Sequence, residues 1–242
     1  MAQAAQYVLL THGAGPLYDE LHELAGNGCD PGPVHAFVAA MACFLAEQGQ
    51  PRPLVVTSAF DSTLEHALAE AGEEADVVSY LALGGNAGKF VHFPAGGAPT
   101  VIDVPNAYTG LPLGDRTVVL KIHGRADPGP GREWESFVVA EDDHIDYAAG
   151  ADIASVVPVT LAAKLRRSHF LFLGYFLEDW SLRVFLHRVW GREKVSYRSW
   201  AVVPGASRIE RELWSRRGIE PLDVTIAEFV DAFDRRLAEV AR

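Results

Sequence analysis

Short apolar stretches rich in β-branched residues alternate along this chain with segments of helical periodicity. The clearest extended stretches cover residues 54–57, 117–122 and 169–173, and each is followed by small or polar residues. Strands that alternate with helices in this way form a parallel sheet with helices packed against it. The pattern predicts an α/β fold with a Rossmann-like, doubly wound parallel sheet and helices on both faces.

The weaker segments complete the expected order of elements. Further strands are expected at 7–11, 75–83, 89–93, 99–104, 199–203 and 220–224. Helices are expected at 16–24, 34–48, 61–71, 141–147, 157–167, 177–190, 208–217 and from 227 onward. Because Gly and Pro interrupt 75–115, this stretch is expected to form a small inserted layer. No repeat or low-complexity linker divides the chain, so we expect a single domain over 1–242.

Composition and charge limit the partners of the protein. The chain is 49% hydrophobic and 22% charged, which is ordinary for a globular protein, and its net charge is −11. This acidic balance argues against broad nucleic-acid binding and against anionic membranes. No apolar run approaches the roughly 20 residues of a spanning helix, and no signal-like segment opens the chain. We therefore expect a cytoplasmic protein without membrane contact.

Metal-ligating residues are sparse in the sequence. The two cysteines, Cys29 and Cys43, are too few for a disulfide framework or a four-thiolate zinc site. The polar run 141–144 is interpreted as a solvated helix start, because four consecutive side chains cannot all face one point. We expect no metal and no zinc.

Candidate chemistry lies directly after three of the expected strands. In an open parallel sheet, ligands bind outside the carboxyl ends of the strands. The positions there are Thr57-Ser58-Ala59-Phe60-Asp61, His123-Gly124 and Gly174-Tyr175-Phe176. A single histidine or glycine at a strand end has ordinary structural explanations. The order of the motifs is therefore more informative than any one of them.

This order resembles the sirtuin-like (silent information regulator-like) family of NAD-consuming proteins, from about residue 54 to the C-terminus. The motifs that carry the resemblance are Thr57-Ser58-Ala59-Phe60-Asp61 before Leu64-Glu65, Leu120-Lys121-Ile122-His123-Gly124, the polar helix 141–147, and Phe172-Leu173-Gly174-Tyr175-Phe176-Leu177. The resemblance implies NAD as substrate or ligand and a role as an NAD glycohydrolase in bacterial antiphage defence. It further implies a homo-oligomer or a partner defence protein.

The resemblance also implies roles for individual residues. His123 would be the base that deprotonates a ribose hydroxyl or a water, a task that suits an imidazole. Asp61 would hold the nicotinamide side, and Gly174 would allow the backbone to approach the cofactor. Short hydrogen-bonding side chains would come from Thr57 and Ser58. The remaining cofactor-binding positions of these motifs are Gly124, Tyr175 and Phe176.

Three positions depart from the family pattern. The catalytic asparagine of the family falls on Ala59, so either the protein is degenerate there or the chain has an inactivating substitution. Phe176 replaces a ribose-binding serine. Gly13-Ala14-Gly15 looks like the phosphate loop but lacks its serine. Our preferred interpretation is that residues 7–24 correspond to a later family segment and that the phosphate-binding opener is absent.

These departures leave alternative functions open. A catalytically silent sirtuin-like module that binds a nucleotide or a partner protein is the main alternative to NAD hydrolysis. A natural enzyme that accepts another nucleotide or an ADP-ribose derivative is a third reading. Protein deacylation is less expected, because the zinc-binding cysteine pairs of deacylating sirtuins are missing.

Overall fold

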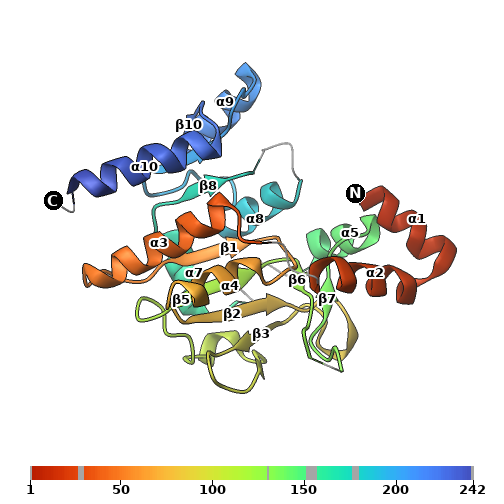
Figure 1. Ribbon diagram of the computed structural model, residues 1–242. Coiled ribbons are helices and arrows are strands. Elements are labelled where there is room, and N and C mark those ends of the chain that lie inside the picture. The colour runs from red at the N-terminus through yellow and green to blue at the C-terminus, as the bar shows by residue number, and fades with distance from the viewer. Residues whose placement is uncertain (1, 27–29, 130, 151–156, 176–179, 241–242) are drawn as a thin grey trace. The chain divides into compact units, whose positions relative to one another are not determined.

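The chain forms an α/β structure with two compact units. The computed structural model describes residues 2–26, 30–129, 131–150, 157–175 and 180–240 (Figure 1). The units are Met1–Val159 and Thr160–Arg242. In the described residues, the first unit contains a five-stranded and a two-stranded sheet and the second a three-stranded sheet. The predicted α/β class is confirmed, and the single domain over 1–242 stays a prediction.

The five-stranded sheet is mixed. Its order is β1 (Leu54–Thr57), β5 (Thr117–Lys121), β2 (Ala75–Tyr80), β3 (Phe90–Phe93) and β4 (Thr100–Val101). The first three strands are parallel, as predicted, whereas β3 and β4 pair antiparallel at one edge. Residues 75–115, expected as a small inserted layer, supply β2, β3 and β4 to this same sheet. They belong to the central sheet because β2 is an interior strand, buried from Asp76 to Tyr80 as is typical of a strand covered on both faces.

Helices α3 (Pro33–Glu47) and α4 (Thr63–Glu70) pack together over one face of this sheet (Figure 1). Small side chains on both helices allow this close approach. The buried cluster between helices and sheet contains Ala39, Ala42, Ala67, Leu68, Val77 and Val119. All five residues of β5 are buried, so its ends are fixed within a packed core.

The strand predicted at 7–11 is wrong, because this stretch lies in α1 (Ala2–His12). Its apolar residues pack at helical spacing, since Ala5, Val8 and Leu9 all lie in one cluster. A continuous apolar run fits either structure, and tertiary packing decided for helix. Gly13, with φ of 86°, joins α1 to α2 (Ala14–Gly26). The triplet Gly13-Ala14-Gly15 is thus no phosphate loop after a strand.

A short hairpin follows β5 and was not predicted. Strands β6 (Gly124–Arg125) and β7 (Ser136–Phe137) pair antiparallel and lead into α5 (Glu141–Ala149). Two-residue strands leave no period in the sequence. The α1–α2 pair packs against this region, and Figure 1 shows it beside β7 and α5. Single 3₁₀ turns occur at Gly84–Asn86 and Pro105–Ala107.

The second unit repeats the strand and helix alternation. Its strands β8 (Leu171–Leu173), β9 (Ser199–Val202) and β10 (Ile219–Leu222) are parallel, with β9 in the middle. The helices are α7 (Val159–Arg166), which begins at the unit boundary, α8 (Trp180–Trp190), α9 (Arg208–Arg216) and α10 (Ile226–Val240). No helix in the described part of the chain is long and apolar enough to cross a membrane.

Candidate functional site

The carboxyl ends of β1 and β5 bring two of the predicted motifs together. The Ile122 amide donates a 3.0 Å hydrogen bond to the Thr57 carbonyl, so the loop after β1 begins beside His123. Within that loop, the Ala59 amide donates to Thr57 Oγ1 at 3.1 Å. Ala59 itself is exposed. Neighbouring parallel strands thus place residues 57–61 and 121–124 at one edge, as the sequence predicted.

Lys121 fixes the shape of the loop after β1. Its side chain is buried, and Nζ forms a 3.0 Å ion pair with Glu65 in the first turn of α4. The same ammonium donates to the Ala59 carbonyl at 3.3 Å and to the Asp61 carbonyl. A buried cation needs such partners to offset its desolvation. One charge therefore ties the backbone of the loop to the helix that follows it.

Asp61 caps α4. Its Oδ1 accepts a 2.9 Å hydrogen bond from the Thr63 amide, which is one of the unpaired donors at the helix start. Burial opposes ionisation of the carboxyl, but hydrogen bonds from Thr63 and the charge of Lys121 lower the pKa of Asp61 below its usual value. Asp61 is thus held as an anion beside the loop, with one oxygen engaged locally.

His123 lies buried at the end of β5, with 5% of its surface exposed. Its carbonyl accepts a hydrogen bond from the Val138 amide at 2.9 Å, which fixes the backbone. The imidazole meets the rings of His144 and Tyr147 nearly edge to face, at centroid distances of 5.5 and 5.1 Å. Tyr147 in turn meets Tyr80 of β2 at 5.2 Å. Aromatic rings on α5 and β2 thus orient the histidine.

His144 was missed as a neighbour of His123. The run 141–144 does begin a helix, as expected, and Asp143 accepts hydrogen bonds from the Val139 and Ala140 amides at 3.1 and 2.8 Å. The one signal in the sequence was the spacing of His144 and Tyr147, because residues three apart lie on one face of a helix and can contact the same side chain. Among the described residues, no group of three His, Cys, Asp or Glu side chains is placed to hold a metal ion.

Gly124 is required by the backbone of the hairpin. Its φ is 92°, and a Cβ there would lie 1.9 Å from the Ser136 carbonyl oxygen. A side chain at this position would overlap the partner strand β7. The need for glycine at position 124 is therefore explained by the protein's own backbone.

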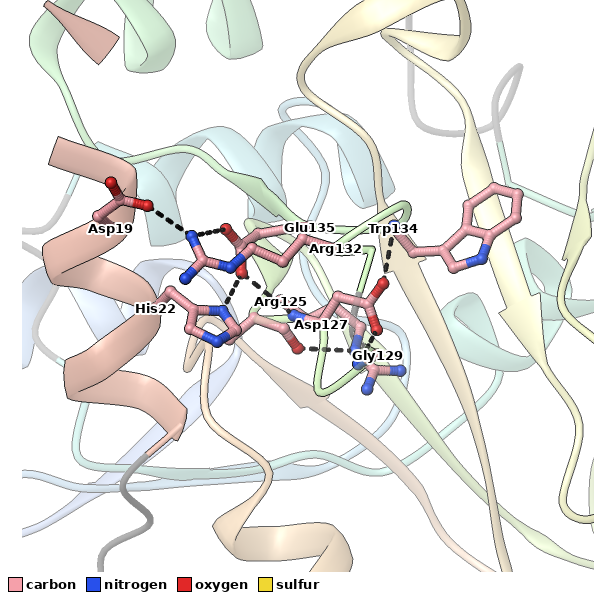
Figure 2. A network of polar contacts seen from close by, with 9 residues as sticks. Asp19, His22, Arg125, Asp127, Gly129, Arg132, Trp134 and Glu135 are labelled. Carbon is pink, nitrogen blue, oxygen red and sulfur yellow. Dashed lines mark hydrogen bonds and ion pairs between the residues drawn. The ribbon is translucent and has the colours of Figure 1, made fainter. Parts of the chain in front are cut away.

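Charged residues continue from β6 into the loop that joins it to β7 (Figure 2). Asp127 closes this loop by accepting from the amides of Gly129 and Trp134 at 3.0 and 2.9 Å. The Arg125 guanidinium lies 4.4 Å from the centre of the Phe93 ring. Burial lowers the pKa of Arg125, while the charges of Glu65 and Asp127 act in the opposite direction.

A second buried polar cluster was not predicted and lies toward the amino end of β2. Asp76, 1% exposed, accepts from Arg116 Nη1 at 2.9 Å and from the Ala95 amide at 3.0 Å. Its other oxygen lies 2.8 Å from His92 Nε2, and His92 Nδ1 lies 2.6 Å from the Tyr108 hydroxyl. These residues are far apart in sequence, so only strand pairing reveals the group.

The third predicted motif belongs to the second unit. Gly174 follows β8 with φ of 72°, which favours glycine, and Tyr175 is half-buried. The first unit therefore assembles Thr57, Ser58, Asp61, His123 and Gly124 on its own. Phe176 and Cys29 lie outside the described residues.

The sheet and the helices packed on it define an α/β, Rossmann-like domain, and the candidate site lies where the parallel strands β1 and β5 end. Residues 53–222 match the model of the SIR2-like domain family, which is more than half of the chain. The chain therefore belongs to the SIR2-like domain family, as the motifs predicted, and this membership supports an NAD-related function. A search of curated proteins finds no match to this chain.

Proposed function

We propose that this SIR2-like domain hydrolyses NAD to nicotinamide and ADP-ribose, as a cytoplasmic effector of bacterial antiphage defence. The observation that carries the proposal is the meeting of His123 with the loop 57–61 at the carboxyl edge. Such an edge presents a base beside short polar side chains, which is what cleavage of a ribosyl bond requires. Family membership over 53–222 supports the choice of NAD as substrate.

In this proposal, water replaces nicotinamide at the anomeric carbon of the ribose. The glycosidic carbon–nitrogen bond breaks with its electron pair going to nicotinamide, and a carbon–oxygen bond to water forms. The proton lost by the water, or by a ribose hydroxyl, goes to His123, which later releases it to solvent. Thr57 and Ser58 would bind the ribose. The anionic Asp61 would face the positively charged nicotinamide ring, where opposite charge favours binding.

Ala59 favours a second candidate function. Its exposed methyl group cannot hydrogen-bond to a ribose hydroxyl or position a water, and the loss of one such group can cost about 10² to 10³ in rate. A catalytically silent module that binds a nucleotide or a partner protein would tolerate this residue. The loop keeps its shape through Thr57 and Lys121, so binding does not depend on the side chain at 59.

The experiment measures nicotinamide release from NAD by the unchanged chain and by an Ala59→Asn variant. We expect the asparagine to raise turnover by about 10² or more, because it supplies the hydrogen-bonding group that the family pattern has at this position. Ala59→Leu is the matched control, since leucine has nearly the size of asparagine but cannot hydrogen-bond. His123→Ala in the Ala59→Asn background tests the base.

Three outcomes separate the candidates. Activity that appears with Ala59→Asn and disappears with His123→Ala supports NAD hydrolysis. Saturable NAD binding without turnover in any variant supports the binding module. If no variant turns over or binds NAD at millimolar concentration, both nucleotide functions are contradicted and a protein partner is the remaining candidate.

A further inference from the structure

The α1–α2 pair lies outside the matched segment 53–222, yet it contacts both sides of the site. We call residues 2–26 the N-terminal hairpin. Its buried Ala5 and Leu17 belong to one apolar cluster with Phe137, Val139 and Ala140. Phe60, which stands between Ala59 and Asp61, packs on the same cluster.

Phe137 is the link between the N-terminal hairpin and the loop after β1. Its ring meets Phe60 edge to face at 5.1 Å and Tyr18 of α2 at 5.7 Å. Burial raises the pKa of Tyr18 to about 12, and the nearby Asp143 carboxylate adds to this. Tyr18 is thus half-buried beside Phe137 of β7. A movement of α2 would be transmitted to Phe60 through the ring of Phe137, which contacts both.

Polar contacts from both helices hold the N-terminal hairpin in place, among them a 2.6 Å ion pair between Asp19 of α2 and Arg132. On α1, Gln6 donates to Asp142 Oδ2 at 2.8 Å and accepts from the Asp142 amide at 3.0 Å. This amide lies in the first turn of α5 and has no partner within the helix, so Gln6 supplies its acceptor. The same helix bears His144 and Tyr147. On α2, His22 Nδ1 lies 2.5 Å from Glu135 Oε2, directly before β7, as Figure 2 shows.

We infer that the N-terminal hairpin positions the catalytic groups, with Gln6 setting α5 against His123 and His22 setting β7 against Phe60. Gln6 and His22 are thus positioning residues that act through Asp142 and Glu135. This inference rests on the proposed function only for its effect on turnover. Its structural part is independent of NAD.

The test compares Gln6→Ala and His22→Ala by amide hydrogen exchange over the whole chain. We expect Gln6→Ala to speed exchange about tenfold in α5 and to shift the NMR signal of the His123 ring. His22→Ala should instead speed exchange in 135–140 and 58–61. Neither variant should change exchange in the strands β2 and β3. In the Ala59→Asn background, each should lower kcat more than it changes KM.

Controls and a rescue make the test decisive. Glu20→Ala alters an exposed residue on the same helix and should change nothing. His22→Asn should restore protection, because the asparagine amide nitrogen occupies nearly the place of Nδ1 and can donate to Glu135. Uniform acceleration over the whole chain, or none in the site segments, overturns the inference. If exchange follows the expected pattern but no variant turns over NAD, only the proposed function fails.

Discussion

The two ends of the central sheet both bury charged side chains, but they use them differently. Toward the amino ends, Asp76 contacts the side chains of Arg116 and His92 besides the Ala95 amide. Glu73 accepts from the side chains of Arg52 and Thr117 at 3.2 and 3.0 Å. At the carboxyl ends, Lys121 directs two of its contacts to backbone carbonyls of a loop. Charges that neutralise one another stabilise the fold, whereas a charge that binds loop backbone shapes a site.

The histidines of the two regions show the same contrast. His92 stands between Asp76 and Tyr108 and is 2% exposed, so its ring nitrogens serve internal partners. Burial raises the pKa of Tyr108, and the Asp76 carboxylate raises it further, which keeps its hydroxyl protonated. His123 meets the rings of His144 and Tyr147 edge to face at the carboxyl edge of the sheet. Because ligands bind at the carboxyl edge of a parallel sheet, His123 is the better candidate of the two for proton transfer with a ligand.

The largest expected effect is at Gly124. Gly124→Ala should cost at least about 4 kcal/mol in the free energy of unfolding, because the new Cβ would overlap the Ser136 carbonyl at 1.9 Å. Urea unfolding measures this. Gly13→Ala is the matched control, because Gly13 also has positive φ but has no atom within 4 Å of the added Cβ. Its cost should be only about 1 kcal/mol, and equal costs would contradict the overlap argument.

Asp76→Asn should have the next largest effect. The substitution replaces a buried carboxylate, which contacts His92 and Arg116, by a neutral amide, and we expect a loss of about 3 kcal/mol in urea unfolding. Asp103→Asn alters an exposed ion pair with Lys89 and should cost less than about 1 kcal/mol. NAD binding should be unaffected by either change. A loss of NAD binding in Asp76→Asn would contradict the view that charges at the amino ends of the sheet stabilise the fold and do not belong to the site.

The pH dependence of Asp76 follows from the direction of its shift. Burial opposes ionisation, but hydrogen bonds from Ala95, Arg116 and His92 prevail and hold the pKa of Asp76 below its usual value. Its stabilising contribution is therefore full above about pH 4 and is lost as pH falls through the lower folded-state pKa. The difference in unfolding free energy between wild type and Asp76→Asn should shrink from about pH 6 to about pH 3.

Lys121→Met should have a smaller effect on stability and a larger one on the site. We expect a loss of about 2 kcal/mol, because Glu65 and two carbonyls lose their buried donor while methionine keeps the packing. Amide exchange in 58–61 should accelerate more than in β2. Lys89→Met, which breaks an exposed ion pair, is the control. Unchanged exchange in the loop would show that Lys121 does not shape it.

The sequence predicted best where a short apolar strand is bounded by proline and by polar loop residues. Residues 54–57 lie between Pro53 and a polar loop, and β1 has those bounds. The stretch 7–11 failed because its apolar run fits a strand or a helix, and only packing of Ala5 and Leu9 on a distant hairpin decides. Contacts between individual side chains were harder to predict than helices and strands. His144 meets His123, and Asp76 meets His92, only after elements distant in sequence have docked.

The hydrogen bonds from Lys121 to backbone carbonyls affect which substitutions the loop after β1 can accept. A carbonyl is present whatever side chain a residue bears, so the path of the loop is independent of the identity of residue 59. The position can exchange one side chain for another without the loop having to refold. Under the proposed function, loss and recovery of catalysis would be separated by a single codon, while the backbone of the loop stays the same.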